Sequence, residues 1–289
     1  MKKLTALLLG AAMAFSLAAC SGTDSSSSES TAPESSSAAE DTSSEASSEE
    51  ASSTASAETA SYDVETVEDG VLIMSTNAAF PPYEMTNDAG EFEGIDVEMA
   101  GEIAKRLGLE LQIDDMDFDA ALLAVQQGKS DIAMAGITIT EDRLVNMDFS
   151  NTYANGVQSV IVPEGSDITS PDDLAGKLVG VQRGTTGYMF CIDEFGEDAV
   201  APFDNGNTAV QNLVSGKVDA VVIDNAPAQE YVAANPGLTI LDTAFADEDY
   251  AIGVAKGNTQ LLDAINSILA EMEADGTTQA IIDKYISAE

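Results

Sequence analysis

The stretches "AALLAVQQGKSDIAMAG" (residues 120–136) and "AVQNLVSGKVDAVVID" (209–224) repeat one pattern: a helix, Gly-Lys, one residue, Asp, and a strand of small apolar residues. The matched positions are Gly128 with Gly216, Lys129 with Lys217 and Asp131 with Asp219. A helix that ends in Gly-Lys before a strand is also a common connection in α/β proteins. Because the match extends through both elements, we interpret it as evidence for two related lobes.

The sequence around the first repeat alternates short apolar runs with amphipathic segments, which predicts an α/β fold. The expected strands are 71–77, 109–114 and 131–136, and the expected helices are 96–108 and 119–129. On the first helix, one apolar face should carry Val97, Ala100, Ala104 and Leu107, and Gly108 should end the helix.

The two repeats also predict where a ligand would bind. Ligands of open α/β sheets bind beyond the carboxyl ends of the strands, so Gly136 and Asp224 should face a cleft between the lobes. A strand at 156–165 would enter the second lobe and a strand at 247–257 would leave it, forming a two-strand hinge. The expected boundaries are 62–156 plus 250–289 for lobe 1 and 157–249 for lobe 2, with helices 258–276 and 277–286 packing on lobe 1.

The first residues read as a secretion signal. Lys2 and Lys3 precede an apolar run that is short for a membrane span, and we expect residues 1–19 to be cleaved. The run ends in Leu-Ala-Ala-Cys, which resembles a bacterial lipobox, so Cys20 would become lipidated; the alternative is a buried cysteine in an ordinary helix. The Ser- and Glu-rich segment up to residue 61 lacks apolar periodicity and is interpreted as a disordered tether between the lipidated Cys20 and the lobes.

Composition narrows the classes of partner and chemistry. With 51 acidic and 11 basic residues, the formal net charge is -40, which argues against nucleic acid as a partner. The sequence has no histidine, which removes the commonest general base and transition-metal ligand. Once Cys20 is lipidated, Cys191 has no cysteine to pair with, so we expect a packing role for it, no metal site and no cofactor.

One of only three arginines, Arg143, follows a run of hydroxyl residues in "GITITEDR". Thr138 would end a strand and Thr140 would cap the next helix, which places Arg143 in the first helical turn. Its guanidinium could then grip a carboxylate with two N–H groups, helped by the Thr138 hydroxyl. The alternative is a surface salt bridge of little energetic value.

Three further features point at the same cleft. "GTTG" (184–187) leads into a helix whose amino end would attract an anion, although it could be only a capped turn. Asp224 ends a strand and could hold an ammonium group, or could be a plain helix cap. Phe80 ends the first strand ahead of two prolines, and Phe118 lies just before a helix. Each could line a pocket or belong to the core.

Together, residues 71–286 resemble the amino-acid-binding branch of the bacterial extracellular solute-binding proteins, family 3. The resemblance rests on "FPPYE", "GIDVEMAGEIAKRLG", "DFDAALLAVQQGKSDIAMAGITITEDR", "DFSNTY", "GVQRGTTG", "VDAVVIDNAPA" and "ADGTTQAIIDKYI". It implies a two-lobe periplasmic-binding-protein-like fold of type II, with a central cleft.

The resemblance also implies roles for individual residues. The carboxylate clamp falls on Arg143 with Thr138, Thr185 and Thr186, the ammonium site on Asp224 and the Gly136 carbonyl, and the aromatic walls on Phe80 and Phe118. Asn77 stands where relatives that bind basic amino acids have aspartate. Its neutrality argues against a lysine or arginine ligand unless other pocket residues compensate. Arg183 would favour an acidic or polar side chain.

The function implied is that of a monomeric receptor of an ABC importer, not an enzyme. It would capture an amino acid with a polar, not strongly basic, side chain by closure of the lobes and deliver it to a permease. A lipid anchor on the outer face of the membrane would suit a Gram-positive bacterium. One alternative is a prephenate or arogenate dehydratase on the same fold, which needs an additional carboxyl group in the pocket as general acid. Another is a receptor's sensory domain, which needs a membrane span and cytoplasmic module after Glu289.

Overall fold

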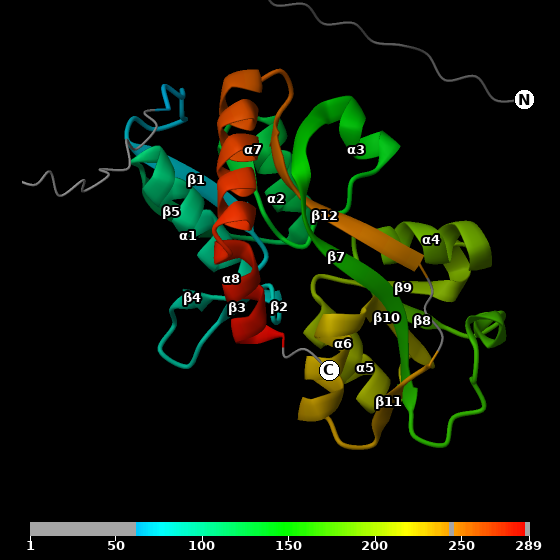
Figure 1. Cartoon of the computed structure of the whole chain (residues 1–289). Helices are drawn as coiled ribbons and strands as arrows, with labels where there is room; N and C mark the ends of the chain where they lie inside the picture. Colours follow the sequence, from blue (N-terminus) through cyan, green and yellow to red (C-terminus); the bar gives the residue numbers. More distant parts are fainter. Residues whose placement is uncertain (1–61, 243–245, 287–289) are drawn as a thin grey trace, which may run out of the picture. The chain divides into compact units, whose positions relative to one another are not determined.

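The computed structural model describes residues 62–242 and 246–286, which lie within one compact unit (Figure 1). The expected signal at 1–19, the lipidated Cys20 and the tether up to 61 lie outside the described residues. No helix in the described ranges has the length and apolarity to cross a membrane.

The described chain is mixed α/β, as the sequence predicts. The strands are β1 (Val71–Thr76), β2 (Ala79–Phe80), β3 (Glu84–Thr86), β4 (Phe92–Glu93), β5 (Glu110–Asp115), β6 (Ile132–Ala133), β7 (Met147–Pro163), β8 (Val179–Gln182), β9 (Val200–Phe203), β10 (Ala220–Asp224), β11 (Leu238–Ile240) and β12 (Ala246–Ala255). The helices are α1 (Ile95–Leu107), α2 (Phe118–Gln126), α3 (Glu141–Asn146), α4 (Thr186–Phe195), α5 (Gly206–Val214), α6 (Asn225–Ala234), α7 (Thr259–Ala274) and α8 (Thr277–Tyr285), with 3-10 turns at Pro171–Leu174 and Glu197–Ala199.

The main sheet has two halves joined by a pair of long strands. Its order is β5-β1-β6-β12-β7-β10-β8-β9, with β11 also paired to β7. β7 runs antiparallel to β12 from Met147 to Gln158, and its last residues pair with β10 and β11 instead. β7 starts well before the expected residue 156 and so belongs to both halves. This is the two-lobe arrangement with a two-strand connection; the lobe boundaries at 156/157 and 249/250 stay predictions.

The Gly-Lys-x-Asp repeat has the same local structure in both halves. Gly128 and Gly216 both adopt φ 66°, which ends α2 and α5 and turns the chain toward the next strand. Asp131 N donates to the Ile73 carbonyl at 2.9 Å, and its carboxylate accepts from Ile73 N at 2.7 Å. Asp219 repeats this exchange with Leu178, at 2.8 Å in both directions. In both halves the aspartate therefore anchors its strand to the neighbouring strand. This shared task explains why an aspartate stands three residues after the glycine in both repeats.

Helix burial differs from the sequence expectation at one position. The face of α1 that packs on the core carries Ile95, Met99, Ile103 and Leu107 with the expected Ala100 and Ala104, whereas Val97 is only half-buried. The buried stripe follows an i, i+4 spacing from Ile95, one residue before the expected start, and this rotates Val97 off it. As expected, α7 and α8 pack beside α1 in the first half (Figure 1).

We predict that the two repeat aspartates differ in their contribution to stability. Asp131 is buried and also accepts from Val67 N, so Asp131→Ala would leave two backbone N–H groups unpaired and lower the free energy of unfolding by about 2 to 4 kcal/mol. The matched variant Asp219→Ala, at an exposed position with one such bond, should cost about 1 kcal/mol or less. Urea denaturation measures both; equal losses would contradict the anchoring role of Asp131.

Candidate functional site

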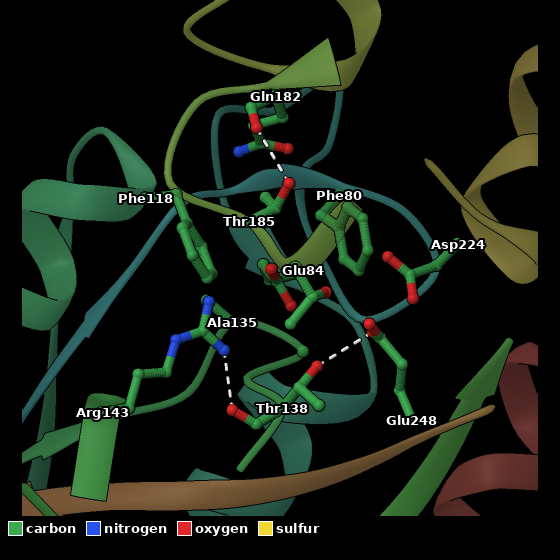
Figure 2. Close-up of a pocket in the computed structure, with 12 residues that line it drawn as sticks. Phe80, Glu84, Phe118, Ala135, Thr138, Arg143, Gln182, Thr185, Asp224 and Glu248 are labelled. Carbon is green, nitrogen blue, oxygen red and sulfur yellow. Dashed lines mark hydrogen bonds between the residues drawn. The ribbon is translucent and has the colours of Figure 1, made fainter. Parts of the chain in front are cut away.

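A pocket with about 300 Å³ of empty space lies where side chains from both halves of the sheet meet (Figure 2). Its lining combines one cation, three carboxyl groups, hydroxyls and two aromatic rings. The lining residues are Phe80, Glu84, Phe118, Ala135, Gly136, Thr138, Arg143, Gln182, Thr185, Thr186, Asp224 and Glu248. Eight of the nine residues predicted to bind the ligand are therefore brought together, and Asn77 is the exception.

Arg143 is positioned by the short helix α3. As expected, Thr140 is the N-cap, and its hydroxyl accepts from Arg143 N at 3.2 Å. The side chain is buried at 8% exposure, so the surface salt bridge considered above is wrong. Its Nη1 donates to the Thr138 carbonyl at 2.7 Å, its Nη2 donates to the Gly184 carbonyl at 3.1 Å, and the guanidinium lies 5.4 Å from the centre of the Phe118 ring. Burial lowers its pKa to about 10, which still leaves it charged at neutral pH.

Thr138 does not end a strand, contrary to the sequence expectation. β6 stops at Ala133, and Thr138 instead forms an isolated bridge with Tyr250 of β12. Its hydroxyl donates to Glu248 Oε2 at 2.9 Å. The bridge fixes this loop against β12, so residues 134–138 form one wall of the pocket without regular strand pairing.

The amino end of α4 lines the opposite half. Thr185 caps the helix, because its hydroxyl accepts from Tyr188 N at 3.2 Å and donates to the Gln182 carbonyl at 2.8 Å. The capped-turn interpretation of this segment is therefore right. The same turn also lines the pocket, and the first residue of the helix, Thr186, lies there with it. A helix amino end in this position attracts negative charge.

Asp224 lies at the end of β10, as the repeat predicts. It occupies the N-cap position of α6, as the helix-cap alternative expects, but its side chain makes no capping hydrogen bond. Instead its Oδ1 accepts from the Tyr250 hydroxyl at 2.5 Å. Burial, reinforced by the nearby Glu248 carboxylate, raises the pKa of Asp224 well above its usual range. A cation next to this carboxyl group would relieve that cost.

The aromatic walls and Gly136 pack tightly together. Phe80 and Phe118 are both buried and both line the pocket, so the core and pocket alternatives hold at once. Phe80 also stacks on Tyr83 at 5.9 Å between ring centres. Gly136 adopts φ 55°, and a Cβ there would lie 2.8 Å from a Phe80 ring carbon. Only glycine fits this close approach, which leaves the adjacent backbone accessible to a ligand.

Two residues named from the resemblance lie outside the pocket lining. Asn77 is buried one layer behind it, donating to the Met116 carbonyl at 2.8 Å and accepting from Gln182 Nε2 at 3.0 Å. Arg183 is exposed and lies 3.5 Å from Asp204, so the expectation that it selects the ligand side chain is wrong. Arg183 is the first residue after β8, in the exposed turn that leads to α4.

Cys191 is a packing residue, as expected. It is a free cysteine, buried in the second half within a cluster that includes Val179, Val181 and Val222. Burial raises its pKa to about 12, which keeps the thiol protonated. Within the described ranges, no three His, Cys, Asp or Glu side chains converge on a possible metal site.

Sequence reasoning missed four lining residues: Glu84, Ala135, Gln182 and Glu248. For Glu248 a signal exists, because it lies two residues before the buried Tyr250 and so shares its face of β12. Glu84 ends the "FPPYE" motif, but β3 is too short for alternation to show which way it faces.

Comparisons with known proteins agree with this geometry. Residues 72–288 match the family of bacterial extracellular solute-binding proteins, family 3. The L-cystine-binding protein TcyJ of Escherichia coli is 32% identical over 226 residues, covering 77% of this chain and 85% of that protein.

Two solved structures extend the match. An ancestral arginine-binding protein bound to glutamine is 43% identical with a TM-score of 0.73, covering 76% of this chain and 100% of that one. The arginine-, lysine-, histidine-binding protein ArtJ of Geobacillus stearothermophilus is 32% identical with a TM-score of 0.72, covering 75% and 96%. The chain therefore belongs to the bacterial extracellular solute-binding proteins, family 3.

Proposed function

We propose that this protein is the receptor of an ABC importer and captures an amino acid in the pocket between the two halves of its sheet. One observation carries the proposal: a buried guanidinium and a buried carboxyl group, Arg143 and Asp224, lie on opposite sides of one pocket (Figure 2). An α-amino acid carries the complementary pair of charged groups on a single carbon atom. Its relatives include proteins named for binding cystine, arginine, lysine and histidine.

Each ligand group has a matching partner in this arrangement. The ligand carboxylate would lie between Arg143 and the amino end of α4, where a charged donor and the helix dipole act together. The ammonium group would contact Asp224 and the carbonyl of Gly136.

The ligand side chain is proposed to be polar. The restriction to side chains that are not strongly basic rests on Asn77, whose amide is occupied by the Met116 carbonyl and by Gln182. Other pocket residues can compensate for the neutral side chain of Asn77. Two carboxyl groups of the lining, Glu84 and Glu248, are candidates. The basicity of the ligand therefore depends on these two residues rather than on Asn77.

Capture by lobe closure is proposed from the contacts that join the halves. Arg143 Nη2 donates to the Gly184 carbonyl at 3.1 Å, Gln182 Nε2 donates to Asn77 at 3.0 Å, and the Tyr231 hydroxyl donates to the Ala79 carbonyl at 2.6 Å. These bonds are few, and among the strands that the structure describes only β7 and β12 run through both halves. A ligand that contacts both halves would add differential affinity for the closed arrangement and shift the population toward it.

The location and partners follow from the same proposal. The family is extracellular, and we propose that lipidated Cys20 and the tether up to residue 61 hold the protein, as a monomer, on the outer face of a Gram-positive cell membrane. A permease in that membrane would recognise the closed arrangement and receive the amino acid.

The dehydratase alternative is kept as a second candidate because of one observation. It requires an additional carboxyl group in the pocket, and Glu84 is a buried one whose pKa is raised by desolvation and by Asp96. The relatives above are named as binding proteins, so we propose that Glu84 contacts a ligand rather than catalyses. Steady-state turnover of prephenate or arogenate by the purified protein would establish the enzyme instead.

We predict that Arg143→Ala weakens amino-acid binding by about 2 to 5 kcal/mol, because it leaves the ligand carboxylate buried without its charged partner. The ligand is first identified in a thermal-shift screen against all amino acids, cystine and small carboxylates. Calorimetry then measures its affinity for wild type and variant. Arg106→Ala is the control. Arg106 forms ion pairs with Glu102 on α1 and with Asp275 at the end of α7, and none of the three lines the pocket. Unchanged affinity in Arg143→Ala would reject the clamp.

We predict that Asp224→Asn discriminates between ligands with and without the α-amino group. The variant should lose about tenfold or more in affinity for the amino acid, equivalent to at least 1.4 kcal/mol, and far less for the matching carboxylic acid that lacks the amine. Competition binding of the two ligands to wild type and variant measures this. Equal losses for both ligands would give Asp224 a role other than holding the ammonium group.

A further inference from the structure

Gln158 is a buried side chain of β7 to which the proposed ligand contacts assign no role. It is 2% exposed, and neither its amide nitrogen nor its amide oxygen has a hydrogen-bond partner within residues 62–242 and 246–286. Leaving a buried amide unpaired costs folding free energy, and buried polar groups in native proteins are nearly always paired. The unpaired amide therefore points to a role outside folding stability.

The pairing of the strands places Gln158 directly beside Asp224. The two residues are opposite partners in the antiparallel pairing of β7 with β10, and Gln158 also pairs with Ala246 of β12 on its other side (Figure 1). Opposite residues of an antiparallel pair point to the same face of the sheet, with Cβ atoms about 5 Å apart. The side chain of Gln158 therefore shares the face of Asp224, which lines the pocket.

The first turn of α4 covers this face. A Cβ atom on Gly187 would lie 2.7 Å from Gln158 Oε1 and 3.3 Å from a methyl carbon of Val222. Val222 precedes Asp224 by two residues in β10, and residues two apart in a strand face the same way. The amide of Gln158 therefore lies next to Asp224 and under the helix turn that lines the pocket through Thr186, behind the lining rather than in it.

Asp224 needs hydrogen-bond donors when it holds the ammonium group of a ligand. The Tyr250 hydroxyl donates to it, but Asp224 also shares a hydrogen bond with the Glu248 carboxyl, which requires a proton on one of the two acids. An ammonium group favours the ionised form of Asp224, which can no longer donate to Glu248. An uncharged N–H donor beside Asp224 would then stabilise its carboxylate without neutralising it.

We propose that Gln158 is a positioning residue that donates a hydrogen bond from Nε2 to Asp224 when the ammonium group of an amino acid occupies the pocket. This rests on the proposed function, because Asp224 must be the group that holds the ammonium. The amide leaves the negative charge of Asp224 to the ligand, whereas a lysine or arginine in its place would neutralise it. Pairing the amide in the complex also recovers the free energy that it costs before binding, so Gln158 contributes to affinity without touching the ligand.

Gln158→Met tests this role, since methionine fills a similar volume without an amide. The thermal unfolding midpoint without ligand should stay unchanged or rise, because the variant lacks the unpaired buried group. By calorimetry, affinity for L-glutamine or L-arginine should fall about tenfold, whereas affinity for the matching acids without the α-amino group, 4-carbamoylbutanoate and 5-guanidinopentanoate, should change about twofold or less. Gln126→Met, at an exposed position on α2, is the matched control and should behave as wild type.

A second measurement shows whether Gln158 acts through Asp224. Asp224→Asn removes the carboxylate that the amide is proposed to support, so the two substitutions should not be additive. Adding Gln158→Met to Asp224→Asn should therefore reduce affinity for L-glutamine or L-arginine by a further factor of about two or less. If the screen described above identifies a different amino acid, that compound and its acid without the amine replace these probes.

The outcomes separate this role from the proposed function. Unchanged amino-acid affinity in Gln158→Met, an equal loss for the acids without the amine, or a further tenfold loss in the Asp224→Asn background would each overturn the role of Gln158 while amino-acid binding stands. An unfolding midpoint that falls together with affinity would also overturn it, because the amide would then serve packing. If wild type binds no amino acid of the screen, both proposals are overturned.

Discussion

The antiparallel pairing of β7 with β12 is the constraint on which the site depends. These strands run through both halves of the sheet, so the groups that they hold can contact residues of both. β12 carries Glu248 and Tyr250 on one face, Tyr250 receives the Thr138 bridge from the first half, and its hydroxyl holds Asp224 of the second half. A single buried tyrosine thus joins the two walls of the pocket, while the halves keep few other connections.

The cation of the pocket, Arg143, is not hydrogen-bonded to any carboxylate in the described part of the chain. A chain with net charge -40 can neutralise a cation anywhere on its surface, yet Arg143 is buried where backbone carbonyls, rather than carboxylates, receive its N–H groups. Carbonyl dipoles hold the guanidinium in place without neutralising it. The positive charge therefore remains available to an anion that enters the pocket, which a salt bridge would have prevented.

The sequence predicted the parts of the structure that repeat or obey a local period. The Gly-Lys-x-Asp repeat is visible because Asp131 and Asp219 do the same backbone task twice, and α/β order follows from alternating apolar runs. The sequence could not predict which way Glu84 faces or that Thr138 forms a bridge. Glu84 lies in a strand of three residues and Thr138 in an isolated bridge, and partners distant in sequence decide how such short segments are oriented. The expected role of Arg183 failed because proximity to Thr185 in sequence does not tell which way a turn residue faces.

The buried carboxyl groups of the pocket suggest how a small ligand would control the arrangement of the two lobes under the proposed function. Burial raises the pKa values of Glu84 and Asp224, so keeping either group ionised inside the pocket costs free energy. The hydrogen bonds between the halves oppose this cost but are few. Under the proposed function, a ligand that compensates the buried charge would shift the balance between the arrangements, and it could do so only when both walls are present. Selectivity and closure would then have the same physical origin, because the charges that choose the ligand would be those that disfavour closing without it.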